Sequence, residues 1–447
     1  MFSVKIVHIV PGSGGTFYCQ NCLRDTALVR ALRAQGHDVM LTPLYLPLFA
    51  DDAALAEEVP VFFGGINVYL QQRFPFFRKT PAWLDRLFDA SWLLRLAARQ
   101  ESSTSARDLG AMTLSMLQGK TGNQAKEVAR LVDWLKDQEK PDVVHLSNAL
   151  LLGLAPQLRE ELDCPVLCTL QDEDTWMEAM RPDEAEACWN AMREAGESVD
   201  LFIAVSQWYA DKIQKAMRIP AARLKVVHLG VENEIFQPDA LPFDPPVIGY
   251  LSRLAPGQGL DRLIDAFIAL KKQSEFHRLR LRATGGITVA HQPFIQAMRQ
   301  KLEAAGCLDD VEFLEDFGKA EREAFLRSIS LLSVPAPGGE AFGAFILEAH
   351  ANGVPVVQPA EGAFPEVVAL TGGGILYDPA QPGAYEEALA ELLSRPDYAA
   401  SLGETGRRAV EKRFNIRVMA DQLAAHYQEC TEKTGTEPAV ISTVCGK

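Results

Sequence analysis

Two glutamates in the run VPAPGGEAFGAFILEAHANGVPVV have the type and spacing of ligand-binding groups. Glu340 closes a loop rich in proline and glycine, and Glu348 follows eight residues later in a predicted helix. The start of a helix offers unpaired backbone N–H groups and the positive end of the helix dipole, which suits a diphosphate. Glu348 could then accept two ribose hydroxyls, and Glu340 could hold the hydroxyls of a hexose. Taken alone, two such glutamates are better explained as solvated surface, so the neighbouring motifs must decide.

An arginine follows the strand predicted in GYLSRLAPGQGLDRLIDAF, residues 249–267. Arg253 lies at the carboxyl end of that strand, before a Pro/Gly turn and a helix that begins near Gly259. Its planar guanidinium can clamp a phosphate through two parallel hydrogen bonds. An exposed charge at the strand end is the alternative, but the two glutamates downstream favour phosphate binding.

The stretch GSGGTFYCQNC, which follows the first apolar run, allows two interpretations. Its glycines suggest a loop that lets the backbone approach a phosphate or sugar, whereas Cys19 and Cys22 suggest a redox or zinc pair. These two cysteines cannot share one zinc ion with Cys164 and Cys168. The four residues of strand that separate Cys164 from Cys168 span about 13 Å, which is too far for two zinc–sulfur bonds of about 2.3 Å each. We expect Cys19 and Cys22 to pack in the interior or line a ligand cleft. A redox-sensitive or metal-binding pair stays the alternative.

The composition excludes several classes of protein. The 447 residues carry a formal charge of −15, which argues against a nucleic-acid binder, since such a protein needs a basic face. No apolar run reaches the length of a membrane helix and no signal peptide precedes the first strand, so we expect a cytoplasmic protein. Residues 74–99 mix aromatic and basic side chains. We expect a helix packed on its domain there, with peripheral contact to the inner face of a membrane as the alternative.

Short apolar runs alternate with helix-length segments along the whole chain. Runs such as VKIVHIV and PVLCTL in the first half, and PPVIGYLSR and VPVVQPA in the second, are typical of parallel strands covered on both faces. The alternation predicts an α/β fold with two Rossmann-like, doubly wound parallel-sheet domains that face each other across a cleft. In such sheets, ligands bind beyond the carboxyl ends of the strands.

Breaks in this alternation give the expected domain boundaries. The N-terminal domain spans 1–238 with a helical insertion at about 73–135, and a proline-rich linker leads to a C-terminal domain at 245–408. A helix at 409–430 is expected to pack back on the N-terminal domain, and 431–447 is expected to form a mobile tail.

Together these motifs resemble the retaining, nucleotide-sugar-dependent glycosyltransferases of family four, which have the GT-B fold. The resemblance is strongest over residues 247–380 and weaker over 4–40 and 142–240. Its most specific element is the E-x7-E spacing of the two glutamates, followed by GVPVV and PEVV. The early GG pair, the run ALVRALRAQGHDV and the run HLGVENEIFQP also fit the family.

Position by position, the resemblance implies a nucleotide-sugar site in the C-terminal domain. The phosphate-binding arginine of the family falls on Arg253, its donor-sugar glutamate on Glu340 and its ribose glutamate on Glu348. Arg253 and Glu340 are thereby the implied catalytic residues. The implied donor site also includes several neighbouring positions, which are Gly14, Gly15, Gln258, Phe342, Gly343, Ala344 and Phe345.

The N-terminal domain is implied to be the acceptor side, where His145, Gln171 and Asp172 are expected to reach the cleft. Two positions depart from the family pattern. Gln258 stands where a second cation on the diphosphate is usual, and Gln171 stands where histidine is frequent. Because a preorganised cation at a leaving group contributes about 3 kcal/mol, both changes bear on the reaction rate.

The resemblance implies that a sugar moves from a nucleotide-diphosphate donor to a glycan, lipid-linked or small-molecule acceptor, with retention of anomeric configuration. It implies no metal and no cofactor besides the donor substrate. The two glutamines motivate an alternative, a catalytically impaired relative that binds nucleotide sugar or glycan as a sensor or partner subunit. A sugar-phosphate isomerase with two similar domains is disfavoured, because the paired glutamates fit a donor site better.

Overall fold

The computed structural model describes residues 3–12, 18–45, 71–72, 106–232 and 240–434. The predicted insertion is therefore described only from residue 106 onward, while the segment 74–99 and the predicted tail beyond residue 434 lie outside the described residues.

The chain divides into two compact units. The first unit holds Met1–Gly14, Asn21–His228 and Met419–Lys447, and the second holds Gly15–Gln20 and Leu229–Val418.

The first unit is built on a six-stranded parallel sheet with the order β2-β1-β3-β4-β5-β6. Its strands are β1 (Lys5–Val10), β2 (Asp38–Pro43), β3 (Val143–Leu146), β4 (Val166–Leu170), β5 (Leu201–Ala204) and β6 (Leu224–Val226). Strands β1, β3, β4 and β5 are almost wholly buried, which explains why the sequence is continuously apolar there. The helices that follow or precede these strands are α1 (Gln20–Ala34), α5 (Ala106–Leu117), α6 (Ala125–Lys136), α7 (Ala155–Leu162), α8 (Glu173–Glu178), α9 (Pro182–Ala195) and α10 (Gln207–Met217).

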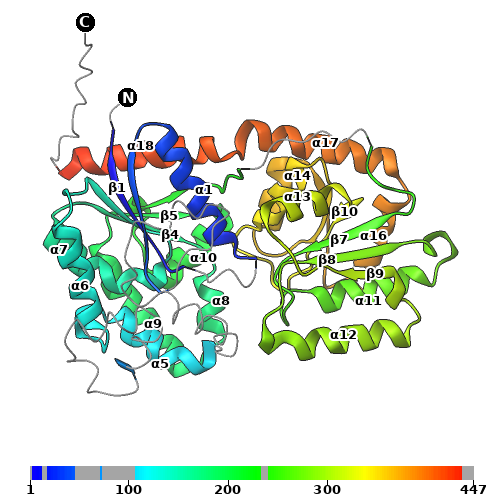
Figure 1. Cartoon of the computed structure of the whole chain (residues 1–447), viewed down its shortest axis with the longest axis horizontal. Coiled ribbons are helices and arrows are strands. Elements are labelled where there is room, and N and C mark those ends of the chain that lie inside the picture. The colour runs from blue at the N-terminus through cyan, green and yellow to red at the C-terminus, as the bar shows by residue number, and fades with distance from the viewer. Residues whose placement is uncertain (1–2, 13–17, 46–70, 73–105, 233–239, 435–447) are drawn as a thin grey trace, which may run out of the picture. The chain divides into compact units, whose positions relative to one another are not determined.

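The second unit contains another six-stranded parallel sheet, with the order β12-β11-β10-β7-β8-β9. Its strands are β7 (Val247–Leu251), β8 (Arg280–Thr284), β9 (Val311–Phe313), β10 (Leu331–Leu332), β11 (Val356–Pro359) and β12 (Gly374–Tyr377). Its helices are α11 (Leu260–Lys271), α12 (Gln292–Ala304), α13 (Lys319–Arg327), α14 (Ala344–Ala351), α15 (Phe364–Thr371), α16 (Ala384–Leu393) and α17 (Pro396–Arg413). Within each unit, helices pack against the sheet in the alternating order that the sequence predicts (Figure 1). The predicted class of two Rossmann-like, doubly wound domains is confirmed.

The last helix, α18 (Ile416–Thr434), groups with the first unit from Met419 onward. Asp421 accepts a hydrogen bond from Gln35 at 2.9 Å, and the Tyr427 hydroxyl lies 2.6 Å from Nδ1 of His145 in β3. Helix α18 therefore helps to build the interior of the first unit. None of the helices in the described part of the chain is both long and apolar enough to cross a membrane.

Candidate active site

Arg253 lies in the loop that follows β7, at the carboxyl edge of the second sheet. The loop is fixed by its own residues, because the Tyr250 hydroxyl donates to the Gln258 carbonyl at 2.9 Å and the Ser252 hydroxyl donates to the Gln258 side chain at 3.1 Å. Burial lowers the pKa of Arg253, while the carboxylate of Glu340 acts in the opposite direction. That Arg253 and Glu340 share a donor site stays a prediction.

Glu340 lies in the loop after β10, which is the neighbour of β7 in the sheet. Its backbone carbonyl accepts a hydrogen bond from Ala363 at 3.0 Å, so the loop after β11 holds the loop after β10 in place. Gly343 ends the loop with φ of 86°, in the left-handed region, and α14 begins at the next residue. A Cβ at Gly343 would come within 2.8 Å of the Phe364 ring, so both conformation and space require glycine here.

Glu348 lies one turn inside α14 and is 5% exposed. Its Oε1 accepts a hydrogen bond from the Tyr18 hydroxyl at 2.5 Å, and its Oε2 pairs with Nε of Arg322 at 3.1 Å. Burial, together with the neighbouring carboxylate, raises the pKa of Tyr18 well above its usual value, so the phenol keeps its proton and donates. The predicted ribose-binding carboxylate is thus held by two buried side chains.

Gln20 forms hydrogen bonds with both the Glu340 loop and the start of α14. Its side-chain oxygen accepts the Ala344 backbone N–H at 2.8 Å, and its side-chain nitrogen donates to Glu340 Oε2 at 3.0 Å. Tyr18 and Gln20 both group with the second unit, as do their partners. The structure thereby brings Glu340, Ala344 and Glu348 together around one short segment.

The remaining residues predicted for the donor site differ in their burial, and two of them lie outside the described residues. The side chains of Phe342 and Phe345 are fully buried, so only their backbone groups could contact a ligand. Gln258 is half-buried in its own loop. Gly14 and Gly15 lie outside the described residues. Ligand contacts by all of these positions stay predictions.

The predicted acceptor-side residues lie in the first unit. His145 is fully buried, with its ring nitrogens next to the hydroxyls of Tyr427 and Thr169, and burial lowers its pKa well below the usual value. Gln171 is also buried, and its side-chain oxygen accepts from Arg24 at 2.6 Å. Asp172 is half-buried before α8 and has φ of 61°. Contact of these three residues with an acceptor stays a prediction.

Cys19 and Cys22 are half-buried and form no disulfide. Among the described residues, no group of three or more His, Cys, Asp or Glu side chains has the geometry to hold a metal ion. Burial raises the pKa of Cys164 to about 12 and that of Cys168 well above its usual value, so both thiols of the second pair stay protonated at neutral pH.

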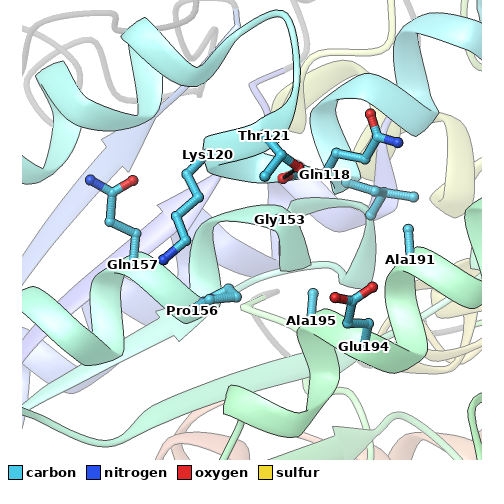
Figure 2. A pocket seen from close by; sticks show the side chains of 10 residues that line it. Gln118, Lys120, Thr121, Gly153, Pro156, Gln157, Ala191, Glu194 and Ala195 are labelled. Carbon is cyan, nitrogen blue, oxygen red and sulfur yellow. Dashed lines mark hydrogen bonds between the residues drawn. The ribbon is translucent and has the colours of Figure 1, made fainter.

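A separate cavity of about 280 Å³ lies in the first unit, and its lining includes none of the predicted site residues that the structure describes. Figure 2 shows the side chains of Lys120 and Gln157 on one side of it and Glu194 on α9 on another. Sequence patterns gave no sign of this cavity, because its lining comes from three segments far apart in the chain.

Three side chains in the second unit's site were missed by the sequence analysis, namely Tyr18, Gln20 and Arg322. Tyr18 and Gln20 stand within the GSGGTFYCQNC stretch, where the glycines and cysteines carried the argument. Their polar side chains just before and at the start of a helix were the available signal. Arg322 in α13 has no local signal, since its partner Glu348 is 26 residues away.

Comparison with solved structures agrees with this architecture. Sucrose-phosphate synthase from Thermosynechococcus elongatus aligns with a TM-score of 0.68 at 18% identity, over 96% of this chain and 99% of that chain. HepE from Anabaena, solved in complex with UDP-glucose, aligns with a TM-score of 0.67 at 18% identity, over 95% of this chain and all of that chain. At such identities the likeness shows the fold, which is the GT-B fold of glycosyltransferases.

Two family models match consecutive parts of the chain. The model "Glycosyl transferase 4-like domain" matches residues 26–230, and the model "Glycosyl transferases group 1" matches residues 231–409. Since the two models together span most of the chain and both describe this class, the chain belongs to the family-four glycosyltransferases with the GT-B fold.

Curated relatives are 26–29% identical to this chain over the regions that align. A GDP-mannose-dependent alpha-(1-6)-phosphatidylinositol monomannoside mannosyltransferase of Mycobacterium tuberculosis is 26% identical over 251 residues, which are 53% of this chain and 63% of the relative. A D-inositol 3-phosphate glycosyltransferase of Corynebacterium glutamicum is 29% identical over 221 residues, or 46% of this chain and 52% of the relative. The matched regions thus cover less than two thirds of these relatives.

Proposed function

We propose that the protein transfers a sugar from a nucleotide-diphosphate donor to an acceptor hydroxyl, with retention of configuration at the anomeric carbon. The observation that supports the proposal is that Glu340, the Ala344 N–H and Glu348 lie together at the start of α14. Arg253 follows β7, the strand that pairs with β10 before the Glu340 loop. A cation, a helix N-terminus and two carboxylates at adjoining strand ends match the charges and hydroxyls of a nucleotide sugar.

Each group has a distinct role in the proposed reaction. Glu348 accepts ribose hydroxyls, the Ala344 N–H and Arg253 bind the diphosphate, and Glu340 orients the donor sugar. The bond between the anomeric carbon and the diphosphate oxygen breaks, and the acceptor oxygen forms the new bond on the same face. The proton of the acceptor hydroxyl passes to the departing diphosphate, so no separate protein base and no metal or cofactor are needed. Arg253 stabilises the charge that develops on the leaving group.

A panel of UDP-, GDP- and ADP-sugars tests this proposal. We expect slow release of the nucleoside diphosphate from one of these donors, even without an acceptor, because water can replace it. The variant Arg253→Ala should lower the release rate by about 100-fold, in line with the loss of one preorganised donor at a developing charge. Arg278→Ala is the control, because Arg278 is exposed and pairs with Asp244 in the same unit.

The same panel distinguishes the impaired relative from the enzyme. Binding of a nucleotide sugar without any release of nucleoside diphosphate would support a sensor or partner subunit instead. Gln258 provides the motive for this alternative, since its amide is neutral and bonded within its own loop.

The proposed acceptor is a hydroxyl of a glycan, a lipid-linked molecule or a small polyol. The names of the relatives, which include a phosphatidylinositol monomannoside and an inositol phosphate, support this range. A lipid-linked acceptor would suit peripheral contact of residues 74–99 with the inner face of a membrane. Co-sedimentation with anionic vesicles tests that contact, and a variant with the basic residues of 74–99 changed to glutamine should lose it.

A further inference from the structure

Three groups that the proposed donor would use are already engaged by one short piece of the chain. The Tyr18 hydroxyl donates to Oε1 of Glu348 at 2.5 Å, the Gln20 oxygen accepts the Ala344 N–H at 2.8 Å, and the Gln20 nitrogen donates to Oε2 of Glu340 at 3.0 Å. The two side chains lie two residues apart, and their partners lie in one loop and one helix of the second unit.

The chemistry of these contacts parallels the chemistry of a nucleotide sugar. The Tyr18 hydroxyl donates to Glu348 as a ribose hydroxyl of the donor would. The Gln20 side-chain oxygen accepts from the first N–H of α14 as a diphosphate oxygen would. The Gln20 side-chain nitrogen donates to Glu340 as a sugar hydroxyl would. A ligand and this segment cannot use the same lone pairs and N–H group at once.

Further contacts hold the segment in this position. The Tyr18 backbone N–H donates to the Gly285 carbonyl at 2.9 Å, and the Arg322 guanidinium lies 5.8 Å from the centre of the Tyr18 ring. Tyr18 is 5% exposed. Arg322 binds the other oxygen of Glu348, at 3.1 Å, and would remain there when Tyr18 leaves. Release of the segment would therefore free Oε1 while the carboxylate stays oriented.

We propose that the Tyr18–Gln20 segment is a built-in occupant of the donor site, which a nucleoside diphosphate must displace in order to bind. This inference rests on the proposed function, because it takes Glu340, Ala344 and Glu348 as donor-binding groups. Displacement lowers the apparent affinity for nucleotide by the free energy that holds the segment in place. In the free protein the segment also keeps the buried carboxylate of Glu348 hydrogen-bonded.

The variant Tyr18→Phe tests the proposal, because it keeps the ring and removes only the hydroxyl that competes for Glu348. Titration calorimetry with UDP and GDP should show about tenfold tighter binding than in the wild type, the scale of one hydrogen bond to a charged group. Tyr209→Phe is a matched control, since the buried Tyr209 hydroxyl donates to Glu173 at 2.7 Å in the first unit. The affinity of that variant should equal that of the wild type.

The variant Gln20→Ala gives a second test at a half-buried position, and it decides the matter if Tyr18→Phe does not fold. It frees both the Ala344 N–H and Oε2 of Glu340, and we expect about tenfold tighter binding for the loss of one neutral hydrogen bond and one hydrogen bond to a carboxylate. Unchanged or weaker binding in the folded variants, with binding retained in the wild type, would overturn the proposal and leave the proposed function standing. Failure of both nucleotides to bind to the wild type and to the variants would overturn the donor site and the proposal together.

Discussion

Replacing Glu348 by glutamine changes the charge of the proposed ribose site while it keeps the size of the side chain. In the structure, one carboxylate oxygen accepts a hydrogen bond from the Tyr18 hydroxyl, and the other forms an ion pair with Arg322. Both side chains of this ion pair are 7% exposed. An amide can accept from only one of these donors, because its nitrogen carries hydrogens of its own. The variant therefore leaves the other donor facing an N–H group in the interior.

The expected size of the effect follows from these contacts. Removing one partner of a buried ion pair costs about 3–5 kcal/mol, and because the amide keeps one hydrogen bond we expect about 3 kcal/mol. For a unit of this size, this loss lowers the melting temperature by about 6–12 °C. A hydrogen bond from a ribose hydroxyl to a carboxylate contributes about 1.5–3 kcal/mol to the free energy of binding. In the variant, Tyr18 also loses its charged acceptor and competes less strongly with the ribose. This effect offsets part of the lost binding free energy, and we expect nucleotide binding to weaken by about tenfold.

Thermal unfolding and titration calorimetry with UDP and GDP measure both effects on the same samples. Glu173→Gln is the matched control, because Glu173 is a fully buried carboxylate of the first unit that accepts from Tyr209 and from the Ala149 N–H. The control should change stability without changing nucleotide affinity. A folded Glu348→Gln protein that binds the nucleotides as tightly as the wild type would refute the ribose assignment.

Three further predictions concern the second unit. Gly403→Ala should destabilise the protein by about 1–3 kcal/mol despite the higher helix propensity of alanine, because its Cβ would overlap the Gly353 carbonyl oxygen; urea unfolding measures this. Burial lowers the pKa of His350 from 6.5 to about 4, so the unfolded chain takes up its proton first and stability falls as the pH drops from 6.5 to 4. This contribution, about 3 kcal/mol, should be absent from the pH profile of a His350→Gln variant. Gln258→Lys should tighten binding of nucleoside diphosphates but not of nucleosides, and equal affinities in calorimetry would show that the donor does not approach this position.

Much of the fold and part of the site followed from local sequence patterns. Buried parallel strands are continuously apolar, so VKIVHIV and PVLCTL predicted β1 and β4, and the proline- and glycine-rich loop that ends at Glu340 predicted a helix containing Glu348, which is α14. The partners of Glu348 could not be predicted in this way. Tyr18 is 330 residues away, and only the folded chain determines that its hydroxyl meets this carboxylate. The same holds for Gln171, whose side chain is bonded to Arg24 across 147 residues.

The central claim is that the second unit binds a nucleotide sugar and that the sugar leaves with retention of configuration. Proton NMR of the sugar released from an α-linked nucleotide sugar tests this most directly, because the first anomer formed can be observed before mutarotation mixes the two. We predict that the α-anomer appears first and that Arg253→Ala suppresses its release. A β-anomer formed first, or no release by the wild type from any donor of the panel, would contradict the account.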